Sequence, residues 1–173
     1  MNRTKPNLLQ RLLHRIFMIL PISMFFAPRM HRMDLWMLKL TGGKYTLSEL
    51  AGWTIIQLTT TGARSGQQRT MPLIATTDGE RIGLIASSFG RSNNPGWYYN
   101  LKSNPICYVN NDGETVCYEA REVEGDEYEK FWGMGVSVYA GYQAYKERAS
   151  HRHIPVMVLE PKEPYLHERN QVH

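Results

Sequence analysis

Two arginines bracket a glycine-rich stretch in the first half of the chain. The stretch reads Gly62-Ala63-Arg64-Ser65-Gly66, and Arg69 follows shortly after it. Glycines let backbone N–H groups turn toward a ligand, serine adds a hydroxyl, and arginine supplies a fixed, bidentate positive charge. The stretch therefore predicts a cradle for phosphate or carboxylate, built from Arg64, Ser65, Gly66 and Arg69. A solvated hairpin loop with surface arginines has the same composition, and no Gly-Lys-Ser/Thr sequence makes it a Walker loop.

A second stretch, ASSFGRSNNPGWYYNLKSNP at residues 86–105, combines small polar residues with aromatic ones. Ser87 and Ser88 stand at the end of an expected strand, and Trp97 and Asn100 stand on an expected short helix. Such residues can form a polar floor and an aromatic wall for a flat ligand. The alternative is that Trp97 belongs to the core and that the serines only shape a turn.

Three tyrosines recur at every third residue near the end of the chain: Tyr139, Tyr142 and Tyr145. On a helix they would share one broad face. That face can pack over a planar substrate and offer phenol hydroxyls, or it can be a stripe of core residues.

Other kinds of site lack support in the sequence. His151 and His153 alternate, but no third ligand stands at a metal-binding spacing, so no metal site is predicted. Cys107 and Cys117 cannot make a disulfide framework, and a reducing compartment is favoured. They would face each other across a hairpin with a three-residue loop, but not with a two-residue loop.

Hydrophobic patterns and turn signals predict mainly antiparallel strands. Strands are expected over 53–61, 69–77, 81–87, 106–110, 114–124 and 154–161. Helices are expected from residue 96 to before Pro105 and over 128–134, continuing or restarting over 142–148. Five or six antiparallel strands with a crossover helix indicate an α+β protein with a closed or nearly closed barrel, and the absence of βαβ alternation argues against a Rossmann sheet.

The 173 residues predict one barrel domain over 46–163, preceded by an arm over 1–45 and followed by a polar tail over 164–173. Residues 1–39 hold seven basic residues against Asp34 alone, so the net charge of +4 comes from the arm and the rest of the chain is acidic. This distribution excludes nucleic acid as the expected partner of the domain.

Residues 8–28 of the arm begin as an amphipathic helix and continue as an apolar run that is too short to span a bilayer. They predict peripheral contact with a membrane or lipid. Two alternatives remain for residues 8–28. The helix can pack against the domain or across a dimer, or the segment can be a signal peptide.

Three stretches of the sequence, taken together, resemble the deazaflavin (F420)-dependent nitroreductase family. They are LTTTGARSGQQRTMPL, ASSFGRSNNPGWYYNLKSNP and YAGYQAYKERASHRHIPVMVLEP. The family is a branch of the split β-barrel flavin and deazaflavin oxidoreductases, and the resemblance covers about residues 55–161. It implies an FMN-binding-like split barrel, preceded by N-terminal helices, that binds coenzyme F420.

The resemblance also implies the roles of single residues. Arg64, Ser65, Gly66 and Arg69 would hold the phosphate and acidic tail of F420. Residues near the deazaflavin ring would be Pro72, Ser87, Ser88, Trp97 and Asn100. Tyr139, Tyr142 and Tyr145 would cover the substrate side, and a tyrosine hydroxyl or Ser87 would stabilise or protonate the anion that forms.

The resemblance implies hydride transfer from reduced F420 to a quinone, a nitroaromatic or another activated acceptor. The protein is expected to be a cytoplasmic monomer or homodimer, with peripheral contact at the inner face of the membrane. The sequence departs from the family pattern, which often has a basic residue at Ala63 and Lys-Gly-Gly at Ser88-Phe89-Gly90, and in some members an aromatic residue at Ile74. The alternatives are a fatty-acid or lipid-binding protein without redox activity on the same scaffold, or a relative that uses FMN or haem.

Overall fold

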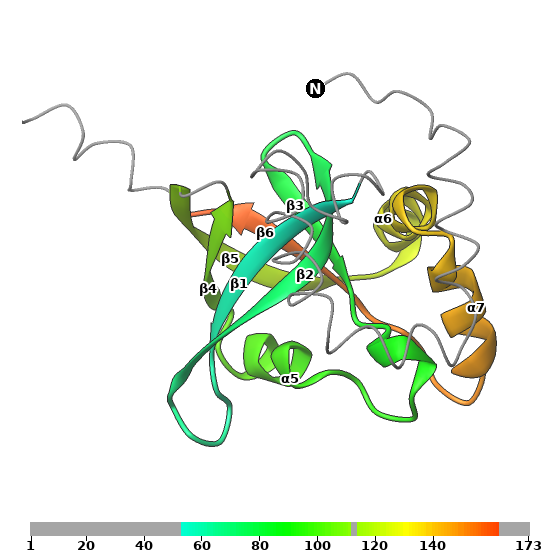
Figure 1. The fold of residues 1–173 in the computed structure, drawn as a ribbon, viewed down its shortest axis with the longest axis horizontal. Coiled ribbons are helices and arrows are strands. Elements are labelled where there is room, and N and C mark those ends of the chain that lie inside the picture. The colour runs from blue at the N-terminus through cyan, green and yellow to red at the C-terminus, as the bar shows by residue number, and fades with distance from the viewer. Residues whose placement is uncertain (1–52, 112–113, 163–173) are drawn as a thin grey trace, which may run out of the picture.

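The structure is a computed structural model that describes residues 53–111 and 114–162. Six antiparallel strands form a closed barrel in the order β1-β2-β3-β6-β5-β4, and β4 pairs back to β1 (Figure 1). The strands are β1 (Thr54–Thr61), β2 (Gln68–Asp78), β3 (Arg81–Ile85), β4 (Ile106–Asn111), β5 (Glu114–Val123) and β6 (Val156–Pro161). The helical elements are η2 (Ser88–Gly90), α5 (Gly96–Ser103), α6 (Gly125–Val138) and α7 (Gly141–Arg148).

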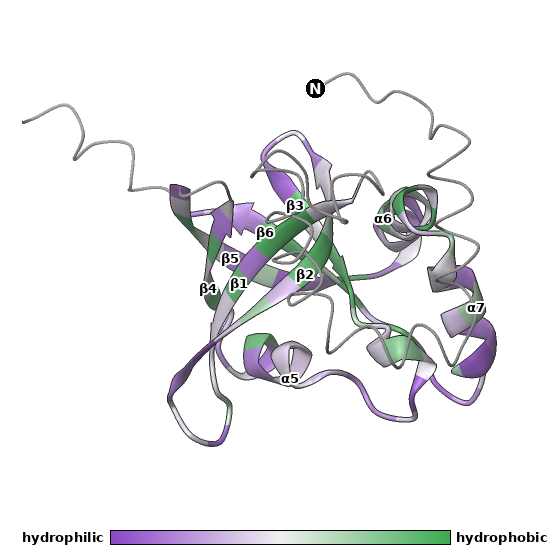
Figure 2. Ribbon diagram, in the orientation of Figure 1, coloured by the Kyte–Doolittle hydropathy of each residue, from purple (hydrophilic) through white to green (hydrophobic). Residues whose placement is uncertain are grey.

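The barrel has two hydrophobic cores, one inside it and one between its outer surface and helices α6 and α7. The inner core includes Leu58, Leu84 and Leu159, all almost fully buried. The outer core includes Phe131 of α6, which packs over β2, β3 and β6. Strand β6 serves both cores, because Val156 and Val158 belong to the outer one while Met157 and Leu159 belong to the inner one. Its run of apolar residues is therefore buried on both faces (Figure 2).

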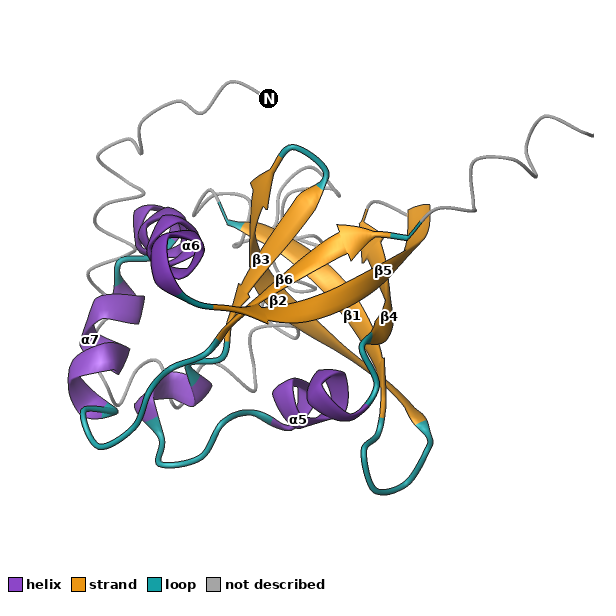
Figure 3. Ribbon diagram, turned by 180° about the vertical axis from the view of Figure 1, so that it is seen from behind, coloured by secondary structure: helices purple, strands orange, loops and turns teal. Residues whose placement is uncertain are grey.

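Helix α5 lies at one end of the barrel, on the connection from β3 to β4 (Figure 3). It buries Trp97, Asn100 and Leu101, whose i, i+3, i+4 spacing puts them on one face of the helix. The helix stops at Asn104, the residue before Pro105, as the restricted backbone of a residue that precedes proline requires.

The hairpin from β4 to β5 sets the positions of the two cysteines. Asn111 pairs with Glu114 across a two-residue connection, and this register puts Cys107 opposite Tyr118 and Cys117 opposite Tyr108. The cysteines therefore do not face each other, and both are free thiols.

The split-barrel fold predicted from the sequence is confirmed, with adjustments at the ends of elements. The third strand stops at Ile85, so Ser87 lies beyond it. The helix expected over 128–134 spans Gly125–Val138, and it ends before Tyr139, whose backbone is extended. The three tyrosines therefore do not share one helix, since only Tyr142 and Tyr145 lie on α7.

The arm over 1–45, including the segment 8–28, and the tail over 164–173 lie outside the described residues. Their boundaries remain predictions from the sequence. Within the described part of the chain, no helix has the length and apolar character needed to cross a bilayer.

Candidate cofactor-binding site

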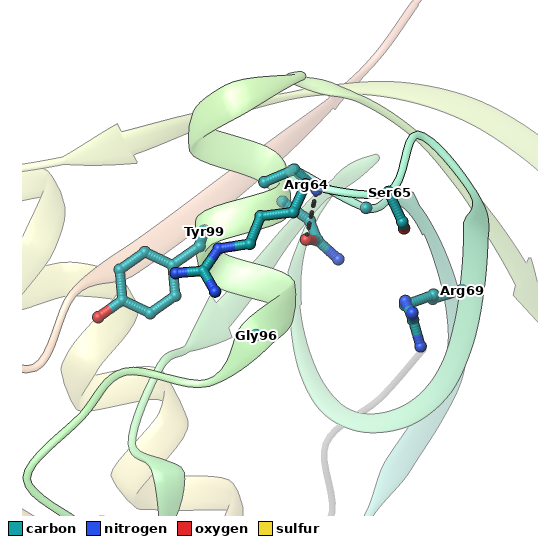
Figure 4. A pocket seen from close by; sticks show the side chains of 8 residues that line it. Arg64, Ser65, Arg69, Gly96 and Tyr99 are labelled. Carbon is teal, nitrogen blue, oxygen red and sulfur yellow. Dashed lines mark hydrogen bonds between the residues drawn. The ribbon is translucent and has the colours of Figure 1, made fainter.

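A pocket of about 480 Å³ opens between α5 and the loop that joins β1 to β2 (Figure 4). The loop supplies Gly62, Ala63, Arg64 and Ser65, strand β2 supplies Arg69, and α5 supplies Gly96, Tyr99 and Asn100. The structure thus brings together four of the residues predicted to bind a cofactor, namely Arg64, Ser65, Arg69 and Asn100.

The loop owes its tight shape to its two glycines. The Gly62 N–H donates to Gln67 O, and the Gly66 N–H donates to Gly62 O, each at 2.8 Å. Gly66 has φ of +67°, which a residue with a side chain adopts only with strain. A Cβ on Gly62 would lie 2.6 Å from Ser65 Oγ, so the serine hydroxyl occupies the space that a side chain at Gly62 would need. Gly66 shapes the loop but does not line the pocket.

Asn100 joins the loop to the helix. Its Oδ1 accepts a hydrogen bond from the Ala63 N–H at 3.0 Å, and its Nδ2 donates to Thr60 Oγ1 at 3.0 Å. Both Asn100 and Thr60 are buried. The side-chain amide therefore fixes the position of the loop relative to α5, in addition to any contact with a ligand.

The two arginines give the pocket a positive charge. Arg64 and Arg69 are exposed, and within residues 53–111 and 114–162 neither guanidinium forms an ion pair with a carboxylate. Elsewhere on the surface, by contrast, Arg121 pairs with both Glu127 and Glu160. The pocket is consequently suited to an anion whose oxygens would replace water around the two guanidinium groups.

Tyr99 and Gly96 are pocket residues that the sequence reasoning missed. Gly96, Tyr99 and Asn100 have i, i+3, i+4 spacing on α5, so they share a face, and this spacing is the signal that would have found them. Tyr99 is 48% exposed, which is unusual for a large aromatic side chain in this structure. Its ring lies beside the pocket in Figure 4.

Two other predicted cofactor residues lie outside this pocket. Trp97 is 3% exposed and belongs to the inner core of the barrel. Pro72 lies on β2 opposite Gln57 and is exposed.

Ser87 and Ser88 lie in and beside the turn η2 that follows β3. Ser88 has φ of +49° and Phe89 has φ of +58°, so two non-glycine residues adopt the left-handed region. The Gly90 N–H donates to Ser87 O at 2.9 Å and closes the turn. In Figure 1 the segment from η2 to α5 runs along the same side of the molecule as the loop between β1 and β2.

The three tyrosines form a buried cluster behind this turn. Tyr139, Tyr142 and Tyr145 are all at most 6% exposed, and their ring centroids lie between 5.4 and 6.2 Å apart. The hydroxyls of Tyr139 and Tyr145 are 3.0 Å apart and share a hydrogen bond. The rings are thus buried among one another, and the cluster meets the turn η2 where Phe89 contacts Tyr145 edge-on.

Burial alters the acidity of this cluster. It raises the pKa of Tyr139 and of Tyr142 well above the usual value, and neighbouring tyrosines add to the effect. Both phenols therefore stay protonated at neutral pH and act as hydrogen-bond donors.

Arg152, between α7 and β6, is a further residue that the sequence reasoning missed. Its Nη2 donates to Ser87 O and its Nε donates to Arg91 O, each at 2.9 Å. No simple sequence pattern marks an arginine whose acceptors are backbone carbonyls distant in the chain. Among the described residues, no group of three or more histidine, cysteine or acidic side chains is placed to hold a metal ion.

A closed split barrel with a pocket bordered by Arg64 and Arg69 at one end is the arrangement expected of flavin- and deazaflavin-type binding barrels. The sequence profile of the F420H2-dependent quinone reductase family matches residues 30–161, which is most of the chain. The chain belongs to this family, and the predicted family, oxidoreductase class and F420 cofactor are confirmed.

Individual relatives agree with this assignment. An F420H2-dependent quinone reductase of Mycobacterium tuberculosis is 37% identical over 105 residues, which cover 59% of this chain and 70% of that protein. The solved structure of an F420H2-dependent reductase, FDR-A, superposes with a TM-score of 0.58 at 36% identity, covering 62% of this chain and 94% of that one. A solved domain-swapped dimer is 32% identical with a TM-score of 0.59, covering 72% of this chain and 97% of that one.

Proposed function

We propose that this protein oxidises reduced F420 and reduces a quinone, and that the pocket between α5 and the loop between β1 and β2 holds the anionic part of the cofactor. The observation that carries this assignment is the pair of guanidinium groups, Arg64 and Arg69, that border a pocket of about 480 Å³ without a carboxylate partner among the described residues. F420 carries a phosphodiester and several carboxylates, which match two bidentate cations and the turned amides of a glycine loop.

The described residues divide into three roles in this proposal. Arg64, Ser65 and Arg69 hold the phosphate and the acidic tail, and Gly66 gives the loop the turn that places them. Asn100 holds the loop in place and borders the ring site, with Trp97 of the same helix supporting that site from the inner core. Pro72, Ser87 and Ser88 bound the ring from β2 and the turn η2. When bound, the reduced cofactor supplies the hydride.

The protein's own contribution to the transfer is orientation and hydrogen bonding. A quinone accepts the hydride and one proton and leaves as the quinol, so negative charge develops on a quinone oxygen during the transfer. The Ser87 hydroxyl and a hydroxyl of the cluster formed by Tyr139, Tyr142 and Tyr145 would donate hydrogen bonds to that oxygen. Because burial raises the pKa of Tyr139 and Tyr142, the phenols stabilise the anion as donors, and solvent supplies the proton.

A titration of the full-length protein with oxidised F420, followed through tryptophan fluorescence, tests the cofactor assignment. Saturable quenching is expected, and FMN should compete poorly because it lacks the acidic tail. Turnover of F420H2 is then measured with a menaquinone-like quinone and with a nitroaromatic compound. Absence of saturable F420 binding, with FMN and fatty acids tested in parallel, would refute the assignment.

We further propose that the enzyme works in the cytoplasm and touches the membrane through residues 8–28, which lie outside the described residues. The support is the amphipathic pattern and the basic character of this part of the sequence. A variant that lacks residues 1–28 should no longer sediment with anionic vesicles and should retain turnover of a water-soluble quinone. Continued sedimentation would contradict membrane contact through this segment, and size-exclusion chromatography with light scattering on both forms decides between monomer and homodimer.

A further inference from the structure

Arg152 holds the segment 87–94 through one guanidinium group. Besides Ser87 O and Arg91 O, its Nη1 donates to Asn94 Oδ1 at 2.5 Å and to His153 O at 3.0 Å. Three of the four acceptors therefore lie on the segment that follows β3, 58 to 65 residues away in the chain. The planar, rigid fork of an arginine can serve several acceptors at once, which a lysine ammonium on its flexible stem does less well.

These acceptors lie on both sides of a strained turn. Ser88, Phe89 and Gly90 have φ of +49°, +58° and +76°, and a bulky residue such as phenylalanine adopts this region only when its surroundings enforce it. Arg152 binds the carbonyl of Ser87, just before the three residues, and the carbonyl of Arg91, just after them. The guanidinium thus spans the turn and holds its two ends at a fixed separation.

The partners of Arg152 indicate that ion pairing is not its role. Among the described residues its hydrogen bonds go to three backbone carbonyls and one side-chain amide, and to no carboxylate. Burial lowers the pKa of the guanidinium, with a smaller opposing effect from Tyr99, although arginine remains protonated throughout the accessible pH range. Partial desolvation of the Arg152 guanidinium is unfavourable, and its hydrogen bonds to the backbone carbonyls offset this. These bonds fix the backbone of the segment 87–94.

The turn that Arg152 fixes leaves two backbone donors available. Within residues 53–111 and 114–162, the N–H groups of Ser88 and Phe89 have no hydrogen-bond acceptor, whereas the Ser87 N–H is bound to Ile85 O. Ser87 is in the right-handed region and Ser88 in the left-handed region, and this sequence of conformations turns successive N–H groups toward a common point. Relaxation of Ser88 and Phe89 to ordinary φ values would separate these donors.

We propose that Arg152 is a positioning residue that clamps the turn 87–91 in its left-handed form and thereby presents Ser87 and Ser88 to the cofactor ring. This inference rests on the proposed function, because that function places Ser87 and Ser88 at the ring. Arg152 itself acts through the turn and touches neither cofactor nor acceptor.

The test compares Arg152→Lys, Arg152→Ala, Phe89→Gly and the double variant Arg152→Ala/Phe89→Gly with the wild type. Arg121→Lys is the matched control, because it removes the same fork from an arginine that also makes four hydrogen bonds but lies outside the pocket and the turn. Two readouts are used: hydrogen–deuterium exchange of peptides covering 86–95 in the cofactor-free protein, and the dissociation constant for F420.

Both Arg152 variants should speed exchange in 86–95 selectively. They should also weaken F420 binding by about tenfold, because displaced hydroxyl and backbone donors of the turn lose hydrogen bonds to the cofactor. The lysine variant should fail to rescue, because it keeps the charge and loses the fork. Glycine at position 89 removes the steric cost of positive φ, so the penalty of Arg152→Ala should shrink in the Phe89→Gly background. Arg121→Lys should change neither readout.

Wild-type exchange and affinity in Arg152→Lys would overturn the proposal, and so would an undiminished penalty in the double variant or an equal effect of Arg121→Lys. If Arg152→Ala does not fold, the lysine variant decides by itself. If the wild type does not bind F420, the proposed function fails, while the exchange data still decide whether Arg152 clamps the turn.

Discussion

The amide oxygen of Asn100 accepts a hydrogen bond from the backbone N–H of Ala63 at 3.0 Å. This contact links α5 to the loop between β1 and β2 across 37 residues of sequence, and it is completed by the bond from Asn100 Nδ2 to Thr60 Oγ1. Asn100 therefore has two roles, because it fixes the position of the loop and also lines the pocket bordered by Arg64 and Arg69.

Substitutions of Asn100 should separate these two roles. Asn100→Ala leaves the buried Thr60 hydroxyl and the Ala63 N–H without this partner, so the free energy of unfolding should fall by about 1–3 kcal/mol. Asn100→Asp keeps the acceptor for the Ala63 N–H, and the Thr60 hydroxyl can rotate to donate to the second carboxylate oxygen, but the change adds a negative charge to a pocket bordered by Arg64 and Arg69. It should cost less stability than alanine and should weaken F420 binding more strongly in low salt. Urea unfolding and F420 titration measure the two effects, and equal losses in both assays for both variants would contradict the separation.

Replacement of Arg64 and Arg69 by alanine should weaken F420 binding by about tenfold or more for each arginine, because a hydrogen bond to a charged group contributes about 1.5–3 kcal/mol. The melting temperature should stay close to that of the wild type, since both side chains are exposed and have no ion-pair partner among the described residues. Salt should reduce the affinity of the wild type more steeply than that of the double variant. Arg121→Ala, in the ion-pair network with Glu127 and Glu160, is the control and should leave F420 affinity unchanged. Unchanged affinity in the double variant would remove the loop from the binding site.

The pH dependence of turnover should show no decline that belongs to the buried tyrosines up to about pH 10. Burial raises the pKa of Tyr139 and of Tyr142 above the ordinary phenol value of about 10, so both remain neutral donors below that pH. Tyr139→Phe removes one side of the 3.0 Å hydroxyl pair with Tyr145 and should lower kcat without changing the shape of the profile. A profile of kcat against pH in both forms is the measurement. If kcat of the wild type declined with rising pH below pH 10, and this decline were absent in Tyr139→Phe, Tyr139 would be a proton source instead of a neutral hydrogen-bond donor.

Cys107 should resist thiol reagents in the native protein. It is fully buried, and burial raises its pKa to about 12, so the reactive thiolate is scarce at neutral pH. The stability that this neutral thiol contributes is fully present below the unfolded-state value of about 9 and is lost as the pH rises toward 12. Labelling with iodoacetamide and peptide mass spectrometry should show modification of Cys107 only after denaturation. The register of β4 and β5 also predicts that mild oxidation leaves no disulfide to Cys117, and a non-reducing digest that yields one would contradict it.

Local patterns in the sequence predicted most of the barrel. The β-forming residues of β1, the apolar run of β6 and the turn signals at Gly79 and Pro105 each act over a few residues, and the structure has the corresponding elements. The loop with Arg64 and Arg69 was found for the same reason, since its chemistry lies within eight residues of sequence.

The features that the sequence did not reveal depend on contacts between distant segments. Arg152 is identified only by carbonyl acceptors 61 and 65 residues away. Tyr139 leaves the helical spacing because α6 ends before it, and no proline marks that end. Whether an aromatic residue such as Trp97 faces a ligand or the core is likewise decided by the packing of α5 on the barrel, and the sequence allows both.

Strand β6 has a consequence for how this protein can change through evolution. Its consecutive side chains alternate between the barrel interior and the layer under α6 and α7, so no position from Val156 to Leu159 is open to solvent. Substitutions there should appear as temperature-sensitive variants with unaltered substrate preference. The loop between β1 and β2 lies outside this doubly buried strand and meets α5 through the hydrogen bond from Ala63 to Asn100, so substitutions in that loop can change ligand preference without rebuilding the barrel.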